Sequence, residues 1–70
     1  MEPQTGDIWR YYNPFRKEEN LVLIHELLRE GPGHFSGKRE LIYWGYELLT
    51  DQYDEFLFTE GNMPHWEKVG

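Results

Sequence analysis

The side chains that could perform chemistry in this chain are few, and their spacing does not suit a reaction. Its three histidines, His25, His34 and His65, do not stand at the short spacing of a zinc-binding pair. Ser36 is the only serine and cysteine is absent. A Ser36 nucleophile with His34 as its base would lie on one glycine-rich loop, without the rigid support that catalysis requires. We therefore expect no enzymatic activity, no metal site and no bound cofactor.

The glycine-rich stretch at residues 31–37 is superficially similar to a phosphate-binding loop. Its glycine spacing is one residue too long for the dinucleotide-binding fingerprint, and the order Ser36-Gly37-Lys38 is wrong for a P-loop. Pro32 also lacks the backbone N–H that a phosphate cradle uses. The stretch therefore predicts a flexible hairpin loop.

Carboxylates are the one plentiful chemical group. The chain has 70 residues, with 13 Asp and Glu against 7 Lys and Arg, for a net charge of −6. Acids and bases balance over residues 1–39, so the whole net charge lies in residues 40–70. A negative domain is a poor match for a polyanion, which argues against nucleic-acid binding. Aromatic and basic residues before residue 40 offer an alternative stacking surface, but acids in the same stretch favour a mixed-charge, solvated face.

Five acids lie between residues 47 and 60, around a predicted strand–turn–strand. Exposed carboxylates have no burial to separate their pKa values into an acid and a base, so we do not expect catalysis from them. They could instead form a negative ridge, with Tyr53 at its tip, that meets a basic groove on a larger protein. The alternative is that they supply only solubility and edge protection. The residues predicted to bind a partner are Glu47, Asp51, Tyr53, Asp54, Glu55 and Glu60.

The elements that must position these residues are predicted to be short strands. Residues 41–49 alternate two sets of side chains, with Trp44 and Tyr46 in one set and Tyr43 and Glu47 in the other. This period of two marks a β-strand. The predicted strands are Ile8–Tyr12, Leu21–Leu28, Leu41–Leu49, Glu55–Thr59 and Trp66–Val69.

Residues 14–30 allow a second, helical interpretation. Ile24 and Leu28 would share one helical face, and Asn13 followed by Pro14 would cap the first turn. The contiguous apolar run and its hairpin-like surroundings favour a strand. We therefore predict an all-β domain, with an α+β domain as the alternative.

The two ends of this pattern resemble a known fold. Residues 6–11, Gly-Asp-Ile-Trp-Arg-Tyr, resemble the first strand of SH3-like β-barrels, and residues 63–69, Met-Pro-His-Trp-Glu-Lys-Val, resemble their short turn and last strand. The chain also looks like small proteins of tailed bacteriophages that share this opening, an aromatic-rich middle and this close. The resemblance implies a small five-stranded barrel over residues 6–70, after a loose N-terminus at residues 1–5.

That resemblance carries no catalytic residues and does not extend to proline-rich peptide binding. The Ala-Leu-Tyr-Asp-Tyr opening and the paired tryptophan of peptide-binding SH3 domains are absent from this chain. A shared fold would not fix the function in any case.

These observations together predict a non-catalytic protein-binding module, a small phage accessory protein that engages a larger host or phage protein. Aromatic residues make up 17% of the chain, more rings than so small an interior readily hides, so exposed rings would join the acidic hairpin in binding. The alternatives are an acidic DNA mimic that inhibits a host nucleic-acid enzyme and a small structural component of a virion. No apolar run approaches membrane-spanning length and the start lacks signal-peptide features, so we expect a cytoplasmic protein without membrane contact.

Overall fold

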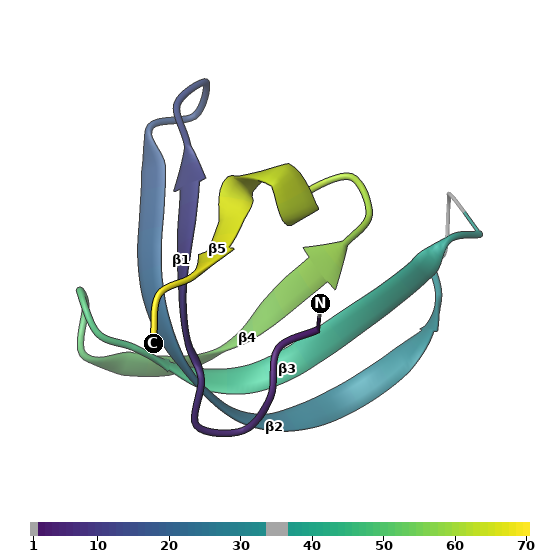
Figure 1. The fold of residues 1–70 in the computed structure, drawn as a ribbon, viewed down its shortest axis with the longest axis horizontal. Helices are drawn as coiled ribbons and strands as arrows, with labels where there is room; N and C mark the ends of the chain where they lie inside the picture. The colour runs from purple at the N-terminus through teal and green to yellow at the C-terminus, as the bar shows by residue number, and fades with distance from the viewer. Residues whose placement is uncertain (1, 34–36) are drawn as a thin grey trace.

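Five antiparallel strands make up nearly all of the regular structure in a computed structural model of the chain, which describes residues 2–33 and 37–70. The strands form one sheet in the order β4-β3-β2-β1-β5 (Figure 1). No helix in these two ranges is long and apolar enough to cross a membrane. The elements are β1 (Ile8–Asn13), β2 (Glu18–Pro32), β3 (Arg39–Glu47), β4 (Gln52–Thr59), the 3-10 helix η1 (Met63–His65) and β5 (Trp66–Lys68).

The prediction of an all-β fold is confirmed, and the helical alternative for residues 14–30 is wrong. Most of this segment belongs to β2, which pairs with β1 on one side and with β3 on the other. Val22 and Ile24 are buried, while Leu23 between them lies opposite Tyr46 on the other face. The apolar run is continuous because both faces of β2 meet other side chains here. A partly exposed helix would need apolar residues on one face only.

The ladder of strands is open. β4 and β5 form its two edges, and no backbone ladder joins them within the described ranges. The closed SH3-like barrel that the resemblance implies is therefore not confirmed. The sheet instead curls, so that η1 and β5 lie across from β4 (Figure 1).

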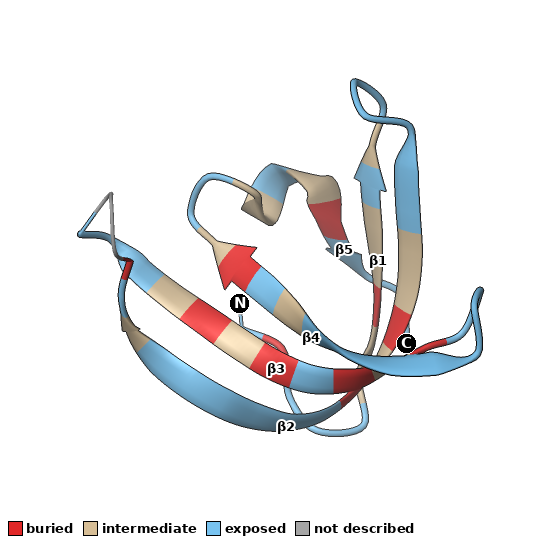
Figure 2. Cartoon of the chain, turned by 180° about the vertical axis from the view of Figure 1, so that it is seen from behind, coloured by how far each residue is buried: buried red, intermediate tan, exposed pale blue. Residues whose placement is uncertain are grey.

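Strand β3 separates the two faces of the sheet most clearly. Leu41, Tyr43, Gly45 and Glu47 are buried, while the side chains between them are half-buried or exposed (Figure 2). This confirms the predicted alternation along β3. It also shows that the set containing Tyr43 faces the core, on what we name the inner face.

Phe58 of β4 lies at the centre of the core. Its ring meets Trp9 and Tyr43 edge-on, with centroids 5.6 Å and 5.3 Å away, and it stacks on Trp66 at 4.0 Å. These three partners come from β1, β3 and β5. One ring therefore connects strands from both ends of the sheet. The same buried cluster also contains Val22, Ile24 and Leu41.

The second half of β2 extends beyond the core. The pairing of β2 with β3 shifts register between Ile24 and Glu26 and again between Leu27 and Arg29, as at β-bulges. No side chain of residues 25–32 is buried, and this half of β2 forms an exposed arm that β3 accompanies (Figure 2).

The glycine-rich loop is shorter than predicted. β2 continues through Gly31 to Pro32, and β3 begins at Arg39. The predicted loop residues His34 and Ser36 lie outside the described part of the chain.

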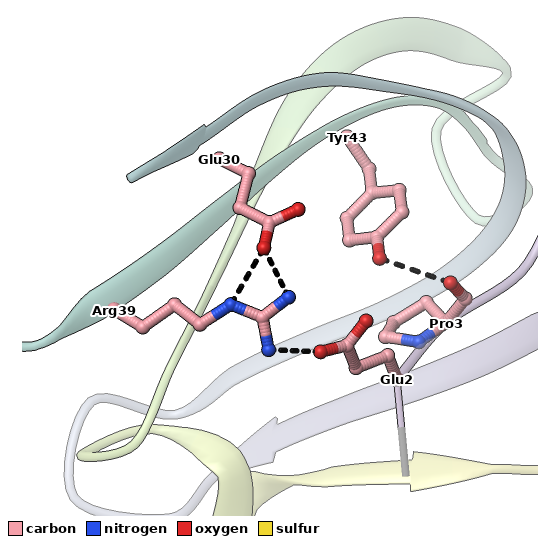
Figure 3. Close-up of polar contacts among 5 residues, drawn as sticks. All are labelled: Glu2, Pro3, Glu30, Arg39 and Tyr43. Atoms are coloured by element: carbon pink, nitrogen blue, oxygen red, sulfur yellow. Dashed lines mark hydrogen bonds and ion pairs between the residues drawn. The ribbon is translucent and has the colours of Figure 1, made fainter. Parts of the chain in front are cut away.

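The N-terminus, expected to be loose at residues 1–5, is attached to the inner face from Glu2 onward. Pro3 is buried, and its carbonyl accepts a 2.9 Å hydrogen bond from the hydroxyl of Tyr43. The carboxylate of Glu2 forms an ion pair with Arg39 (Figure 3). A buried hydrogen bond and an ion pair therefore hold this segment in place.

Arg39 also joins this segment to β2. Its Nε donates to Oε1 of Glu30 over 2.8 Å, while another guanidinium nitrogen pairs with Glu2 (Figure 3). The hydrogen bonds to Glu30 and then to Glu2 raise the pKa of Arg39 above its ordinary value. Because exposed ion pairs are individually weak, this link determines where the segment lies more than it adds to stability.

We predict that Gly45→Ala destabilises the fold by about 1–3 kcal/mol, the usual effect of overfilling a packed site. A Cβ atom at Gly45 would lie 2.7 Å from Cγ1 of Val22 and 3.0 Å from the carbonyl oxygen of Leu23, and Val22 is fully buried. Urea denaturation measures the free energy of unfolding. Gly31→Ala is the matched control, since nothing lies within 4 Å of a Cβ atom there. An equal loss in both variants would contradict the packing explanation.

We predict that Tyr43→Phe makes the fold less sensitive to alkali. Burial, followed by the charge of Glu2, raises the pKa of the Tyr43 hydroxyl above its ordinary value of 10.0. The contribution of this hydroxyl to stability is therefore complete below pH 10.0 and is lost as the pH rises through the higher pKa of the folded state.

Near neutral pH the free energy of unfolding of the Tyr43→Phe variant should be lower than that of the wild type by about 0.5–1.5 kcal/mol, the net value of one hydrogen bond. Above pH 10.0 the difference from the wild type should shrink. Urea denaturation at a series of pH values measures both effects. A difference that stays constant with pH would show that ionisation of Tyr43 does not contribute.

A candidate protein-binding surface on the outer face of the sheet

Exposed aromatic side chains gather on the outer face of the sheet, which looks away from the core. Trp44 of β3 and Tyr53 of β4 stack, with ring centroids 5.8 Å apart and ring planes 9° apart. Tyr53 also contacts Tyr46 of β3 at 5.0 Å and His25 of β2 at 5.2 Å. We name these four rings, His25, Trp44, Tyr46 and Tyr53, the aromatic patch.

Strand register explains why these rings meet. Directly opposed residues on antiparallel strands share a face, with their Cβ atoms about 4.5–5.5 Å apart. Tyr46 is opposite Tyr53, and Trp44 shares their face because it lies two residues from Tyr46 along β3. His25 occupies the first register shift of β2, where the bulge brings its ring against Tyr53.

Trp44 and Tyr53 are exposed, although the chain buries its other two tryptophans. Trp44 is 36% exposed and Tyr53 is 54% exposed, whereas Trp9 and Trp66 are only 3% and 8% exposed. Leu57, two residues beyond Glu55 on β4, is 42% exposed and extends the apolar area on the same face. A contiguous exposed apolar surface on a small domain is typical of an interaction site.

Two carboxylates lie on either side of Trp44. The register places Trp44 opposite Glu26 of β2 and opposite Glu55 of β4, so the three side chains share the outer face. Both carboxylates are exposed, and neither forms an ion pair in the part of the chain that the structure describes. Arg29 lies farther along β2, opposite Ile42. The two residues directly opposite Trp44 are therefore both carboxylates.

Tyr53 and Glu55 are the two predicted partner-binding residues that lie on this surface. The sequence placed Tyr53 at the tip of a hairpin, but β4 already begins at Gln52. Tyr53 is therefore held within the sheet, where its ring joins the aromatic patch.

Three other predicted residues lie away from the patch. Asp51 occupies the β3–β4 turn with a φ of 60°, a left-handed conformation. Asp54 accepts a 2.7 Å hydrogen bond from the backbone N–H of Glu55, and Glu60 forms a 3.3 Å ion pair with Lys38. Asp51 and Glu60 lie just outside the two ends of β4, and these positions suit the alternative role of turn and edge residues.

Glu47, also predicted to bind a partner, is buried and only 4% exposed. Its carboxylate accepts hydrogen bonds from the backbone N–H groups of Leu21 at 2.6 Å, Leu49 at 2.9 Å and Thr50 at 3.2 Å. It connects β2 to the β3–β4 turn and is not available to a partner. Glu47 belongs to the same alternating set as Tyr43, so both residues lie on the inner face of β3.

A cavity of about 230 Å³ opens on the inner side of the sheet, beside the N-terminal segment. Pro3, Leu41 and Phe58 form part of its wall, and Arg39 at its rim is already bonded to two carboxylates. Within the described ranges no group of three or more His, Cys, Asp or Glu side chains is placed to hold a metal ion. The aromatic patch therefore indicates a ligand more strongly than this cavity does.

The sequence did not identify most of the patch. Trp44 and Tyr46 were visible as an alternating pair, but the pattern does not say which set faces outward. His25 and Glu26 are neighbours and would point to opposite faces of a regular strand, whereas the register shift brings both beside the patch. No family model, curated protein or solved structure matches the chain.

We predict that Glu47→Ala lowers the free energy of unfolding by about 2–4 kcal/mol, because three backbone N–H groups lose their shared acceptor. Glu47→Gln keeps one acceptor oxygen and should lie between the wild type and the alanine variant. Urea denaturation gives the energies, and hydrogen exchange at Leu21 shows whether that amide opens.

Glu55→Ala is the matched control, since this carboxylate is exposed and should change stability by less than about 0.5 kcal/mol. Equal stability of the Glu47→Ala and Glu55→Ala variants would rule out a structural role for the buried carboxylate.

Proposed function

We propose that this protein is a non-catalytic protein-binding module that engages a larger protein through the aromatic patch. The observation that carries the proposal is the stacked and exposed pair Trp44–Tyr53. A small domain gains stability when it buries large rings, so a stacked pair on the surface is better explained by contact with a partner.

The patch has the properties of an interface centre. Tryptophan and tyrosine dominate the energetics of protein interfaces, and they lose little conformational entropy on binding. Here two strands of the sheet hold them, so they are positioned before a partner arrives. Glu26 and Glu55 supply a polar rim around Trp44.

The acidic residues of the second half act mainly at long range. The net charge of −6 comes from residues 40–70 and attracts a partner with a basic surface. In this proposal Asp51, Asp54 and Glu60 contribute to that field, while Glu55 and Tyr53 contact the partner.

We also infer that the curled sheet is a variant of the SH3-like barrel. The first strand β1 and the turn η1 before the short β5 support this inference, because the resemblance rests on the residues of these elements. An origin in a tailed bacteriophage and a cytoplasmic location rest on the sequence alone.

Affinity capture with tagged variants tests the proposed function. Trp44→Ala and Tyr53→Ala should each abolish capture of a protein that the wild type retains from a cell lysate. Truncation of an aromatic anchor costs about 2 kcal/mol, which is roughly thirtyfold in affinity. The captured protein is identified by mass spectrometry, and its affinity for each variant is then measured with the purified pair.

Phe15→Ala is the control variant, because Phe15 is 91% exposed and lies in the turn between β1 and β2. It should retain the partner fully. A further variant has Asp51, Asp54 and Glu60 changed to Lys. If this variant loses the partner while both patch variants retain it, the proposal is wrong and the acidic residues make the contact.

A further inference from the structure

We propose that the aromatic patch receives an arginine side chain of the partner, with its guanidinium over Trp44 and between the carboxylates of Glu26 and Glu55. This inference rests on the proposed function and names the chemical group that the surface recognises. Three features carry it: the row of residues across the sheet, the charge around Trp44, and a similar arrangement elsewhere in the chain.

Glu26, Trp44 and Glu55 form one row across three neighbouring strands. Adjacent strands lie about 4.8 Å apart, so the two glutamates flank the indole from positions about 10 Å from each other. Tyr53 stacks against the indole, and 36% of Trp44 remains exposed. An incoming planar group therefore finds an aromatic surface with an acceptor on either side.

The chemistry of this row suits a cation. A cation over the face of a tryptophan is attracted by the ring, and its N–H groups form charge-assisted hydrogen bonds with nearby carboxylates. Neither Glu26 nor Glu55 has an ion-pair partner among the described residues, and Arg29 on the same face is opposite Ile42 and not Trp44. The row therefore has acceptors and no cation opposite Trp44.

The chain already contains this arrangement once, complete with its own arginine. On β1, the guanidinium of Arg10 lies over the ring of Tyr12, 5.3 Å from its centroid. Arg10 also donates from Nε to Oε2 of Glu19 at 3.0 Å, and Glu19 is opposite Tyr12 in the sheet. Trp44 is likewise an aromatic ring with a carboxylate opposite it in the sheet. It has a second opposed carboxylate, and no arginine lies opposite it.

Arginine suits this site better than lysine. The guanidinium is planar, so it can stack on the indole while the N–H groups at its edge point sideways toward the carboxylates. The ammonium of lysine is more strongly hydrated and cannot stack in this way. The partner segment is therefore expected to present an exposed arginine.

Nuclear magnetic resonance titration of the full chain tests this proposal. The probe is acetyl-Gly-Arg-Gly-amide, and the comparison peptide carries citrulline, which has nearly the shape of arginine without its charge. We expect the arginine peptide to shift the indole N–H signal of Trp44 but not those of Trp9 and Trp66. A single cation–π contact with a hydrogen bond gives a dissociation constant of about millimolar, and citrulline should bind at least about fivefold more weakly.

Charge variants separate the site from the overall field of the protein. Glu26→Gln combined with Glu55→Gln should lower the affinity for the arginine peptide by about fivefold. Asp51→Asn combined with Glu60→Gln removes the same charge away from the patch and should change the affinity by less than about twofold. Equal weakening by both pairs, or equal binding of arginine and citrulline, would overturn the proposal.

The two proposals fail in different ways. If capture of the partner depends on Trp44 and Tyr53 but the arginine peptide binds no better than the citrulline peptide, the arginine proposal is wrong and the proposed function stands. If neither capture nor peptide binding depends on these residues, both proposals are wrong.

Discussion

The stacking of Phe58 on Trp66 is the contact on which the rest of the structure depends. These residues belong to β4 and β5, the two opposite edges of the sheet, yet their ring centroids are 4.0 Å apart. The sheet must curl to bring them together, and the indole N–H of Trp66 adds a 3.3 Å hydrogen bond to the carbonyl of Leu57. Side chains thus join the two edges where the backbone ladder does not. The curl creates an inner face, where Trp9 and Tyr43 complete the core, and an outer face on the other side of the sheet.

An open sheet leaves backbone groups unpaired along its edges, and such edges invite association with other strands. The carbonyl of Leu57 accepts from the side chain of Asn62 at 2.9 Å, and the N–H of Thr59 donates to the same side chain at 2.8 Å. Asp54 covers the N–H of Glu55 near the other end of β4. The side chains of Asp54 and Asn62 therefore cover backbone groups along this edge of the sheet.

The strands could be predicted from the sequence because alternation is a local property. Residues 41–49 show it without any tertiary information, and β3 follows it. The sequence could not show which set faces the core, since Glu47 belongs to the buried set and is satisfied only by amides brought to it by the fold. It also could not place His25 and Glu26 together, because a bulge depends on the pairing with β3. Whether the sheet closes depends on contacts between residues distant in the chain, such as Phe58 and Trp66.

The separation of β2 into a buried half and an exposed half bears on how this protein can evolve. Val22 and Ile24, which precede the register shifts, are buried, whereas no side chain of residues 25–32 is. Substitutions in the first half disturb the core, while those in the second half alter the surface beside Trp44 and leave the core intact. Evolution can therefore vary the surface beside Trp44 by substitution in one stretch of β2, while selection for folding acts on the other stretch.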